Sequence, residues 1–242
     1  PISQGKHYPF SVKPDEKVSV QDFMAIYRDH LEGTEYDLTK GLAAGPFGNP
    51  NRWPTPRSVK PEGKKNLDWE RCISMFRCSY SFVAQSRSWL PDAIGGVLWF
   101  GEDAPDTTCY VPLYSGVTEV PESWAQGERH VFDRNHAWWA FNFVNNWASL
   151  KWSYMIKDIN AMQEKYEGLF FAEQPAIEEK ALALYEEDPE KAVAFITDYT
   201  YSNMMAVENA WWTLGQYLVG KYQDGYVMTP EGKQEQVGYP TE

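Results

Sequence analysis

The sequence is poor in cysteine, in basic residues and in long apolar runs, and each shortage excludes a class of protein. Three cysteines among 242 residues are too few for a disulfide framework in a chain of this length. With 22 basic against 34 acidic residues, the formal net charge is -12, which argues against nucleic acid and against an anionic membrane surface as partners. No apolar run reaches the roughly 18 residues that span a bilayer, and residues 1–17 lack the apolar centre of a signal peptide. We therefore expect a globular protein that binds neither nucleic acid nor membrane.

The histidines and cysteines are not spaced as metal ligands. His7, His30, His130 and His136 form no HExxH arrangement, and the cysteines form no CxxC pair. We expect no zinc site and no other metal site.

The sequence is rich in aromatic residues, and one stretch has the alternation of a half-buried strand. Residues 79–87 alternate with a period of two. The side expected to face a core carries Tyr80, Phe82 and Ala84. The mostly polar side carries Ser79, Ser81, Val83, Gln85 and Arg87. Two more apolar segments, residues 94–100 and 107–111, follow with turn residues between them, and together they predict an antiparallel meander.

Two arginines and a glutamine are candidate site residues. Arg87 ends the first strand on its polar side, where a guanidinium can bind a carboxylate or a polarised carbonyl. Gln85 lies on the same side and could support that contact. Arg52 lies in a long loop rich in Gly, Pro and Asn, and such loops often carry function. A structural ion pair between Arg87 and an Asp or Glu is the alternative, which the sequence leaves open.

Helical patterns precede and follow the meander. Ser19 and Asp22 predict the start of a first helix and Gly33 its end, with the charged cluster Arg28, Asp29, His30 and Glu32 solvated near that end. From Asp133 the apolar period becomes 3.6. We expect that helix to end or kink at Pro175, a short acidic helix to follow, and two further helices to begin near residues 189 and 202.

Three amides lie among the aromatic residues of the region that follows Asp133. Asn142, Asn145 and Asn146 either form hydrogen bonds across helices or line a pocket. The tryptophans at helical spacing are expected in the core, with a carbohydrate-binding platform as the alternative.

Several runs resemble a known family in that family's order. They are FMAIYRDHLEGTEYDLTKGLAAGPFGNPNRW (residues 23–53), ERCIS (70–74), YSFVAQSRSWLP (80–91) and VPLYSGVTEVPESW (111–124). They are similar to the later part of the bacterial cysteine dipeptidases of the N-terminal-nucleophile hydrolase superfamily. The resemblance implies an αββα sandwich, no metal or organic cofactor, and hydrolysis of dipeptides through an acyl-enzyme on an amino-terminal cysteine.

The resemblance gives an α+β fold class and a division of the chain into two parts. Residues 1–132 are expected to supply antiparallel strands of the sandwich, and residues 133–242 a helical extension packed on it. Residue one is Pro1, so we expect a carboxyl-terminal portion of a dipeptidase that carries no catalytic nucleophile. Arg87, Gln85 and Arg52 would then contact substrate.

The expected partners follow from the same resemblance. They are a dipeptide and the missing amino-terminal part of the same protein, with a homo-oligomer left open. The location is open between exported (periplasmic or secreted) and cytoplasmic, in a bacterium.

Two other functions compete with this hypothesis. One is a non-catalytic binding or structural module with an aromatic groove. The other is an internal cysteine nucleophile, Cys72, Cys78 or Cys109. Strand parity places Cys72 and Cys78 on the apolar side, where burial would raise the pKa of a thiol and remove its reactivity, so we disfavour it.

Overall fold

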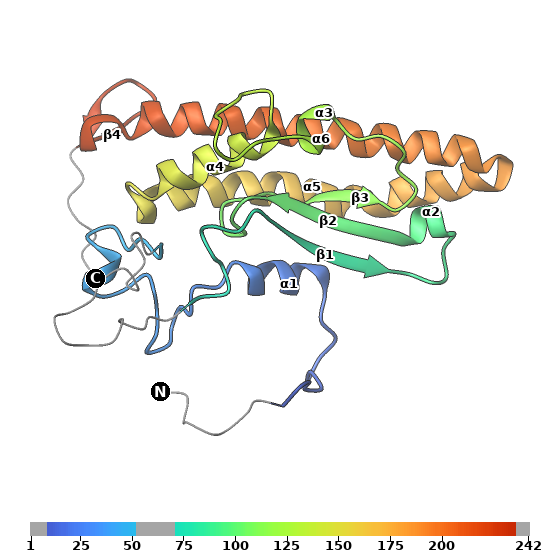
Figure 1. Ribbon diagram of the computed structural model, residues 1–242, viewed down its shortest axis with the longest axis horizontal. Coiled ribbons are helices and arrows are strands. Elements are labelled where there is room, and N and C mark those ends of the chain that lie inside the picture. Colours follow the sequence, from blue (N-terminus) through green and yellow to red (C-terminus); the bar gives the residue numbers. More distant parts are fainter. Residues whose placement is uncertain (1–8, 52–70, 236–242) are drawn as a thin grey trace.

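The chain forms a small antiparallel sheet beside long helices (Figure 1). The computed structural model describes residues 9–51 and 71–235. The strands of the sheet are β1 (Tyr80–Ser86), β2 (Gly96–Glu102) and β3 (Val111–Tyr114). The helices are α1 (Val20–Tyr27), α2 (Asp92–Gly95), α3 (Glu122–Ala125), α4 (Ala137–Ala148), α5 (Trp152–Glu187) and α6 (Pro189–Lys221), with 3-10 turns η1 (Leu42–Ala44) and η3 (Gln223–Gly225) and a small hairpin of β4 (Val227–Met228) and β5 (Gln234–Glu235). The predicted α+β class and meander are confirmed.

The first helix begins where the sequence predicts. The Ser19 hydroxyl accepts a hydrogen bond from the Asp22 backbone N–H, and the Asp22 carboxylate accepts one from the Ser19 backbone N–H. This reciprocal capping satisfies two backbone donors that a helix start leaves free. The helix ends at Tyr27, one and a half turns before the predicted stop at Gly33.

The carboxyl-terminal helices differ in number and bounds from those that the sequence predicts. The single helix expected from Asp133 to Pro175 is divided into α4, which starts at Ala137, and α5, which starts at Trp152. α5 continues through Pro175 to Glu187, so the expected end there is wrong. α6 is also continuous across residue 202, where a separate helix was expected. Proline removes one helical hydrogen bond, and the packing of α5 along α6 and the sheet holds the helix together across it. The predicted start at Asp188–Pro189 is confirmed, since the Asp188 carboxylate accepts from the Glu190 backbone N–H. In the described residues, no helix combines the length and apolar character needed to cross a membrane.

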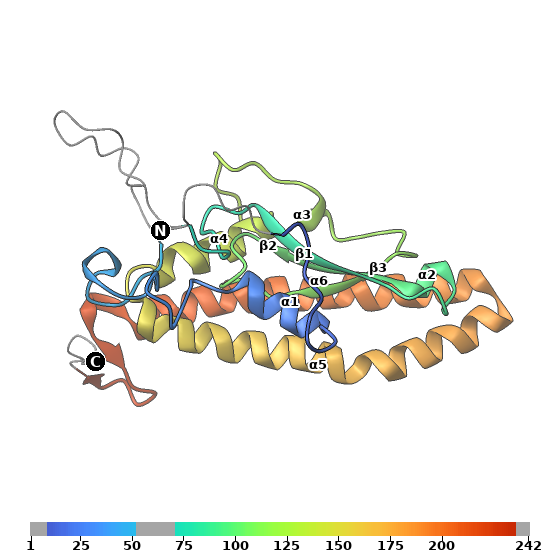
Figure 2. The same ribbon diagram turned by 90° about the horizontal axis from the view of Figure 1, so that it is seen from below.

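One face of the sheet packs against the helices. The strands lie in the order β1-β2-β3, and Val83 pairs with Trp99, which pairs with Pro112. Trp99 is fully buried and stacks on Phe171 of α5, with ring centroids 4.3 Å apart. The long helices run beside this face in both ribbon views (Figures 1 and 2).

The opposite face carries the aromatic residues that were expected in the core, and that expectation is wrong. Tyr80 is 56% exposed and Phe82 43% exposed. Tyr80 stacks on both Phe82 and Phe100, and we call these three residues the aromatic sheet face. The sheet turns its mixed side inward because its polar groups find partners there. Ser81 shares a hydrogen bond with the Tyr110 hydroxyl, and Gln85 accepts one from the Trp99 indole.

The connection between β2 and β3 is a buried loop. All residues from Gly101 to Tyr110 are buried, although connections usually run over a surface. The third strand begins at Val111, so the segment 107–111 expected as strand is mostly loop. A buried loop must satisfy its backbone polar groups within the protein, and the helices around it supply the partners described next.

Candidate functional site

The buried loop, residues 103–110, accepts hydrogen bonds from side chains of the surrounding helices. Arg28, directly after α1, donates to the carbonyls of Pro105 and Thr108. Gln163 of α5 donates to the carbonyls of Asp106 and Thr108, and Trp211 of α6 donates to that of Thr107. The loop is therefore fixed from several sides.

Arg28 also forms a largely buried ion pair with Glu167 of α5, in which the Arg28 side chain is 22% exposed and that of Glu167 9%. Its Nη1 and Nη2 lie 3.0 and 2.5 Å from Oε2 and Oε1 of the carboxylate. The same carboxylate accepts from the Tyr110 backbone N–H at 2.9 Å. The pair raises the pKa of Arg28 against the opposing effect of burial. The expectation that Arg28 is solvated is wrong, because α1 ends early and turns this side chain inward.

His30 is likewise buried, held between two carboxylates. Its Nε2 lies 2.9 Å from Oδ2 of Asp106, and its Nδ1 lies 2.9 Å from Oε1 of Glu32. Although burial opposes the charged form, the two carboxylates raise the pKa of His30 to about 9. At neutral pH the ring is therefore a cation with both nitrogens bound. The expected solvation of His30 is wrong for the same reason as that of Arg28.

A cavity of about 990 Å³ lies against this network, between α1, the loop that contains η1, and α5. Arg28, His30, Asp106 and Glu167 line it, together with Ser153. This set does not form a hydroxyl nucleophile with its base. A general base must be able to accept a proton, and the His30 ring already holds one on each nitrogen.

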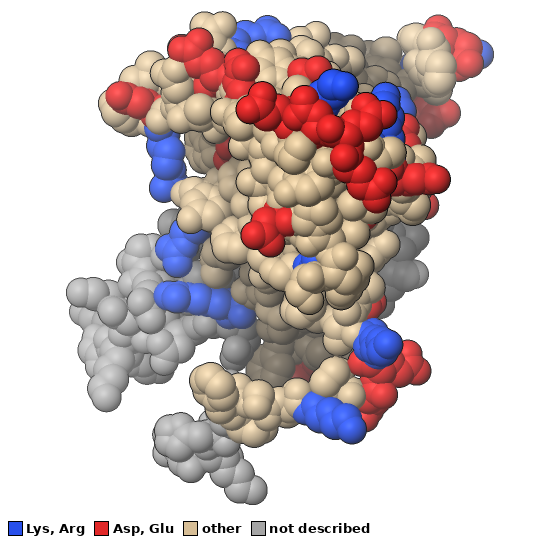
Figure 3. Space-filling view, turned by 90° about the vertical axis from the view of Figure 1, so that its right-hand side faces the viewer, with Lys and Arg blue, Asp and Glu red and all other residues tan. Residues whose placement is uncertain are grey.

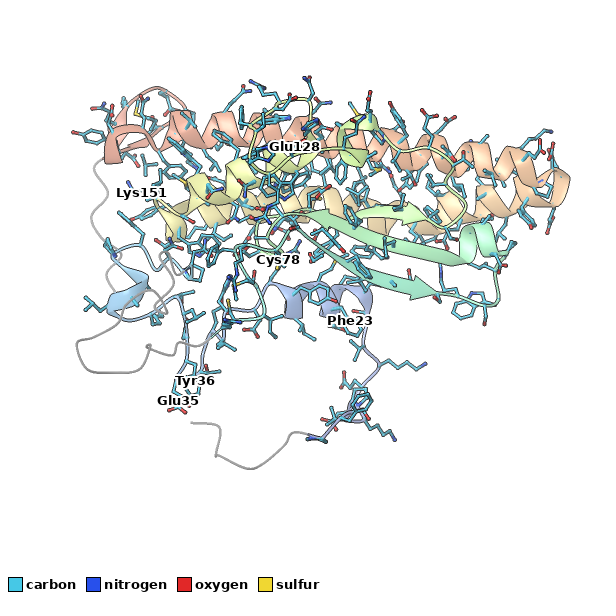
Figure 4. All side chains as sticks on the ribbon, viewed as in Figure 1. Phe23, Glu35, Tyr36, Cys78, Glu128 and Lys151 are labelled. Carbon is cyan, nitrogen blue, oxygen red and sulfur yellow. The ribbon has the colours of Figure 1, made fainter. Side chains whose placement is uncertain are left out.

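A second hollow lies at the end of the sheet where β1 starts and β2 finishes. Its volume is about 540 Å³. An adjoining hollow of about 270 Å³ shares Arg129, Trp138 and Trp139 with it and reaches Tyr80 and Trp124. We call the two together the tryptophan groove. The first part is lined by Phe76, Arg77, Cys78, Asp103, Arg129, His130, Trp138, Trp139, Asn142 and Asn146. Figure 4 shows Cys78 at this end of the sheet.

Two buried acids lie at the base of the groove. Burial raises the pKa of Asp103 to about 7, although the amides of Asn142 and Asn145 donate to its carboxylate at 3.0 and 2.9 Å. Burial, with the charge of Asp103 beside it, raises the pKa of Glu102 to about 8. The amides do not bond across helices, since Asn142 and Asn145 donate to Asp103 of the buried loop and Asn146 donates to Asn142 of its own helix. Asn142 and Asn146 line the groove, as the second alternative has it.

The two arginines of the groove form no ion pair within the described part of the chain. Among the described residues, neither Arg77 nor Arg129 forms an ion pair with a carboxylate. Arg129 instead lies over the Trp138 ring, with its guanidinium carbon 5.7 Å from the ring centroid. Both side chains are exposed. The groove therefore presents two free guanidinium groups beside aromatic walls.

The structure places Arg87 and Gln85 away from these cavities. Arg87 donates to both carboxylate oxygens of Glu178 of α5 at 2.6 Å, and to the carbonyls of Ile94 and Gly95. This is the structural ion pair that the sequence left open as the alternative. Gln85 accepts from Trp99. Arg52 lies outside the described residues. Substrate contact by any of the three stays a prediction.

The cysteines are free thiols in unreactive surroundings. Burial raises the pKa of Cys109 far above its ordinary value and also raises that of Cys78. Cys72 donates to the carbonyl of Ser74. Cys72 and Cys78 precede β1 and do not share a strand, so that part of the expectation is wrong. Among the described residues, no group of three or more His, Cys, Asp or Glu side chains could hold a metal ion.

Comparison with known proteins gives a family and three partial relatives. The profile of the family described as peptidase family C69 matches residues 2–165. A probable dipeptidase of Latilactobacillus sakei is 28% identical over 54% of this chain and 23% of its own length. The probable dipeptidase B of Lactococcus lactis is 28% identical over 56% of this chain and 24% of its own, and a probable dipeptidase of Salmonella dublin is 30% identical over 48% and 22%. The chain thus spans about a quarter of the length of these relatives.

Proposed function

The chain belongs to peptidase family C69, and from this membership we propose that it is the carboxyl-terminal portion of a dipeptidase whose cysteine nucleophile lies outside these 242 residues. The observation that carries the proposal is the family match over residues 2–165 together with dipeptidase relatives about four times as long as the matched segment. In this reaction the α-amine of the cysteine takes the proton of its thiol, the sulfur attacks the peptide carbonyl, and fixed donors hold the oxyanion. The C–N bond then breaks, the leaving amine takes the proton, and water hydrolyses the thioester to release the second amino acid.

The surroundings of the thiols in this chain support the proposal that the nucleophile lies elsewhere. A reactive cysteine needs a lowered pKa, beside a cation or at a helix start. Cys78 and Cys109 have raised pKa values, and Cys109 is fully buried. The His30 ring is engaged on both sides and activates neither.

The exposure of the aromatic sheet face supports the proposal that another part of the same protein packs on it. Tyr80 and Phe82 are large apolar side chains left about half exposed on a sheet, and such a face normally packs on another layer. A second sheet supplied by the amino-terminal part would cover it and complete an αββα sandwich. Residues 1–132 would then belong to the sandwich and residues 133–242 to the helical portion.

Activity measurements on two proteins test the proposal. The complete gene product that contains this chain should hydrolyse dipeptides, and a thiol-blocking reagent should abolish that activity. The 242-residue chain should hydrolyse none. Thiol-dependent turnover by the 242-residue chain would contradict the proposal, as would an intact protein that hydrolyses no dipeptide.

A substitution in the aromatic sheet face tests the missing layer separately. Phe82→Ser should change the stability of the 242-residue chain little, and should destabilise the complete protein by about 2 kcal/mol, as expected for burial of a large apolar side chain. Leu150→Ser is the control, because Leu150 is 59% exposed outside the sheet. Equal small effects of Phe82→Ser in both proteins would show that nothing covers this face.

The tryptophan groove favours a second candidate, a non-catalytic binding module. Trp124, Trp138 and Trp139 gather along one groove, and aromatic walls suit sugars and peptides. Titration of the 242-residue chain with sugars and with peptides, followed by tryptophan fluorescence, separates the two candidates. Tight binding to this chain favours the module, whereas a wall of an incomplete site should bind neither tightly.

A further inference from the structure

Two arginines that form no ion pair among the described residues line one groove of a protein with a negative net charge. The chain carries a formal net charge of -12, and acidic side chains gather on the end that includes the α5–α6 turn (Figure 3). The groove lies at the other end of the sheet, where β1 starts (Figure 1). Three acids share the lining of the groove with Arg77 and Arg129: Glu128 pairs with His130, and the pKa values of Glu102 and Asp103 are raised to about 8 and about 7. The two guanidinium groups are therefore the groups of the groove that can bind an anion.

The surroundings of the two guanidinium groups limit what they can bind. Arg129 is oriented by its contact with the Trp138 ring. The Asn146 amide donates to Asn142, which is itself anchored on Asp103, so one wall of the groove is a connected polar row. Phe76, Trp138 and Trp139 provide apolar wall beside this polar row. A small ligand that combines a carboxylate with an apolar side chain matches this arrangement, since guanidinium groups bind carboxylates at two points.

We propose that Arg77 and Arg129 bind the terminal carboxylate of the dipeptide, and that Trp138 and Trp139 contact the side chain of its carboxyl-terminal residue. This inference rests on the proposed function and adds the substrate class, dipeptides with a free carboxylate and an apolar second residue. The groove lies next to the aromatic sheet face through Tyr80, which lines its second part. The part of the enzyme that covers that face would therefore border the bound dipeptide.

Kinetics on the complete enzyme test the assignment with two substrates that differ only in charge. Alanyl-phenylalanine carries the carboxylate, and alanyl-phenylalanine amide does not. The wild-type enzyme should have a kcat/KM at least tenfold higher for the free acid. Arg77→Gln and Arg129→Gln should each raise KM for the free acid about tenfold or more, and should leave KM for the amide within about twofold.

Arg134→Gln is the matched control, because Arg134 lies over the Trp212 ring and does not line the groove. It should leave both substrates unchanged. If the groove variants do not fold, the wild-type enzyme still tests the inference. Equal kcat/KM values of the wild-type enzyme for the free acid and for the amide would overturn it. So would a loss in Arg77→Gln that is equal for both substrates. In either case the proposed function survives, because it fails only if the intact protein hydrolyses no dipeptide.

Discussion

Arg28 and Glu167, which are 139 positions apart in sequence, join the end of α1 to the middle of α5 through two hydrogen-bonded contacts. The carboxylate also accepts from the backbone of Tyr110 and so ties the buried loop into the same contact. Breaking one member of a buried ion pair leaves the other member charged without a partner.

Glu167→Gln should therefore destabilise the chain by about 3 kcal/mol, within the range for a broken buried pair. Urea unfolding followed by circular dichroism measures this change. Lys191→Ala is the control. Lys191 and Glu187 form an exposed pair at 3.5 Å, and its loss should cost less than about 1 kcal/mol. A Glu167→Gln effect as small as that of the control would contradict the structural role given to the Arg28 pair.

Arg87→Ala should lower kcat/KM of the intact enzyme at least tenfold while the fold stays intact, if Arg87 contacts substrate as the sequence predicts. Arg87 is also paired with Glu178, so Glu178→Gln is measured beside it. A similar loss of thermal stability in both variants, with unchanged kinetics, would show that Arg87 only anchors the end of β1 on α5.

Glu102→Gln should change how stability depends on pH. Burial raises the pKa of Glu102 from 4.5 to about 8, so the folded protein binds more protons than the unfolded chain between these values. Stability therefore falls as pH rises through this interval. The variant should match the wild type near pH 4 and should be more stable above pH 8, by at most about 5 kcal/mol at about 1.4 kcal/mol per pKa unit.

Thermal melts across this range measure the difference between the two proteins. Glu231→Gln, at an exposed position, is the control. Parallel pH profiles for wild type and Glu102→Gln would contradict the raised pKa of Glu102.

Iodoacetamide should label all three cysteines of the native chain slowly, and Cys109 slowest of all. Cys109 has no exposed surface, and burial raises its pKa, so few thiolates form and few reagent molecules reach them. Mass spectrometry of timed samples gives the three rates. A cysteine that reacts faster in the native than in the urea-unfolded chain would reopen the hypothesis of an internal nucleophile.

Local signals in the sequence were sufficient for two helix starts and for the first two strands of the meander, but not for the start of α4 or the bounds of β3. Ser19 with Asp22, and Asp188 with Pro189, predict helix starts because capping depends on neighbouring residues. The period of two in residues 79–87 predicts a strand for the same reason. The strand's inward side could not be predicted, because it depends on Trp99 and Tyr110, which lie far along the chain and satisfy Gln85 and Ser81.

The candidate site was largely missed, because its residues meet only through the fold. From the sequence, Arg28 and His30 were predicted to lie at a solvated helix end. Only the fold brings Glu167 and Asp106 beside them. No pattern in the sequence indicated Arg77 as a site residue. Asn142 was the exception, since lining a pocket was one of the two alternatives given for an amide among aromatic residues.

The buried loop between β2 and β3 links the unfolding of the sheet to that of the helices. Its carbonyls are held by side chains from the end of α1, from α5 and from α6, so no one of these segments can detach without releasing it. Amide hydrogens of residues 107–110 should therefore exchange with deuterium only when the whole unit opens, at the rate of global unfolding. Although it connects two strands, the loop is therefore part of the core that the sheet and the helices share.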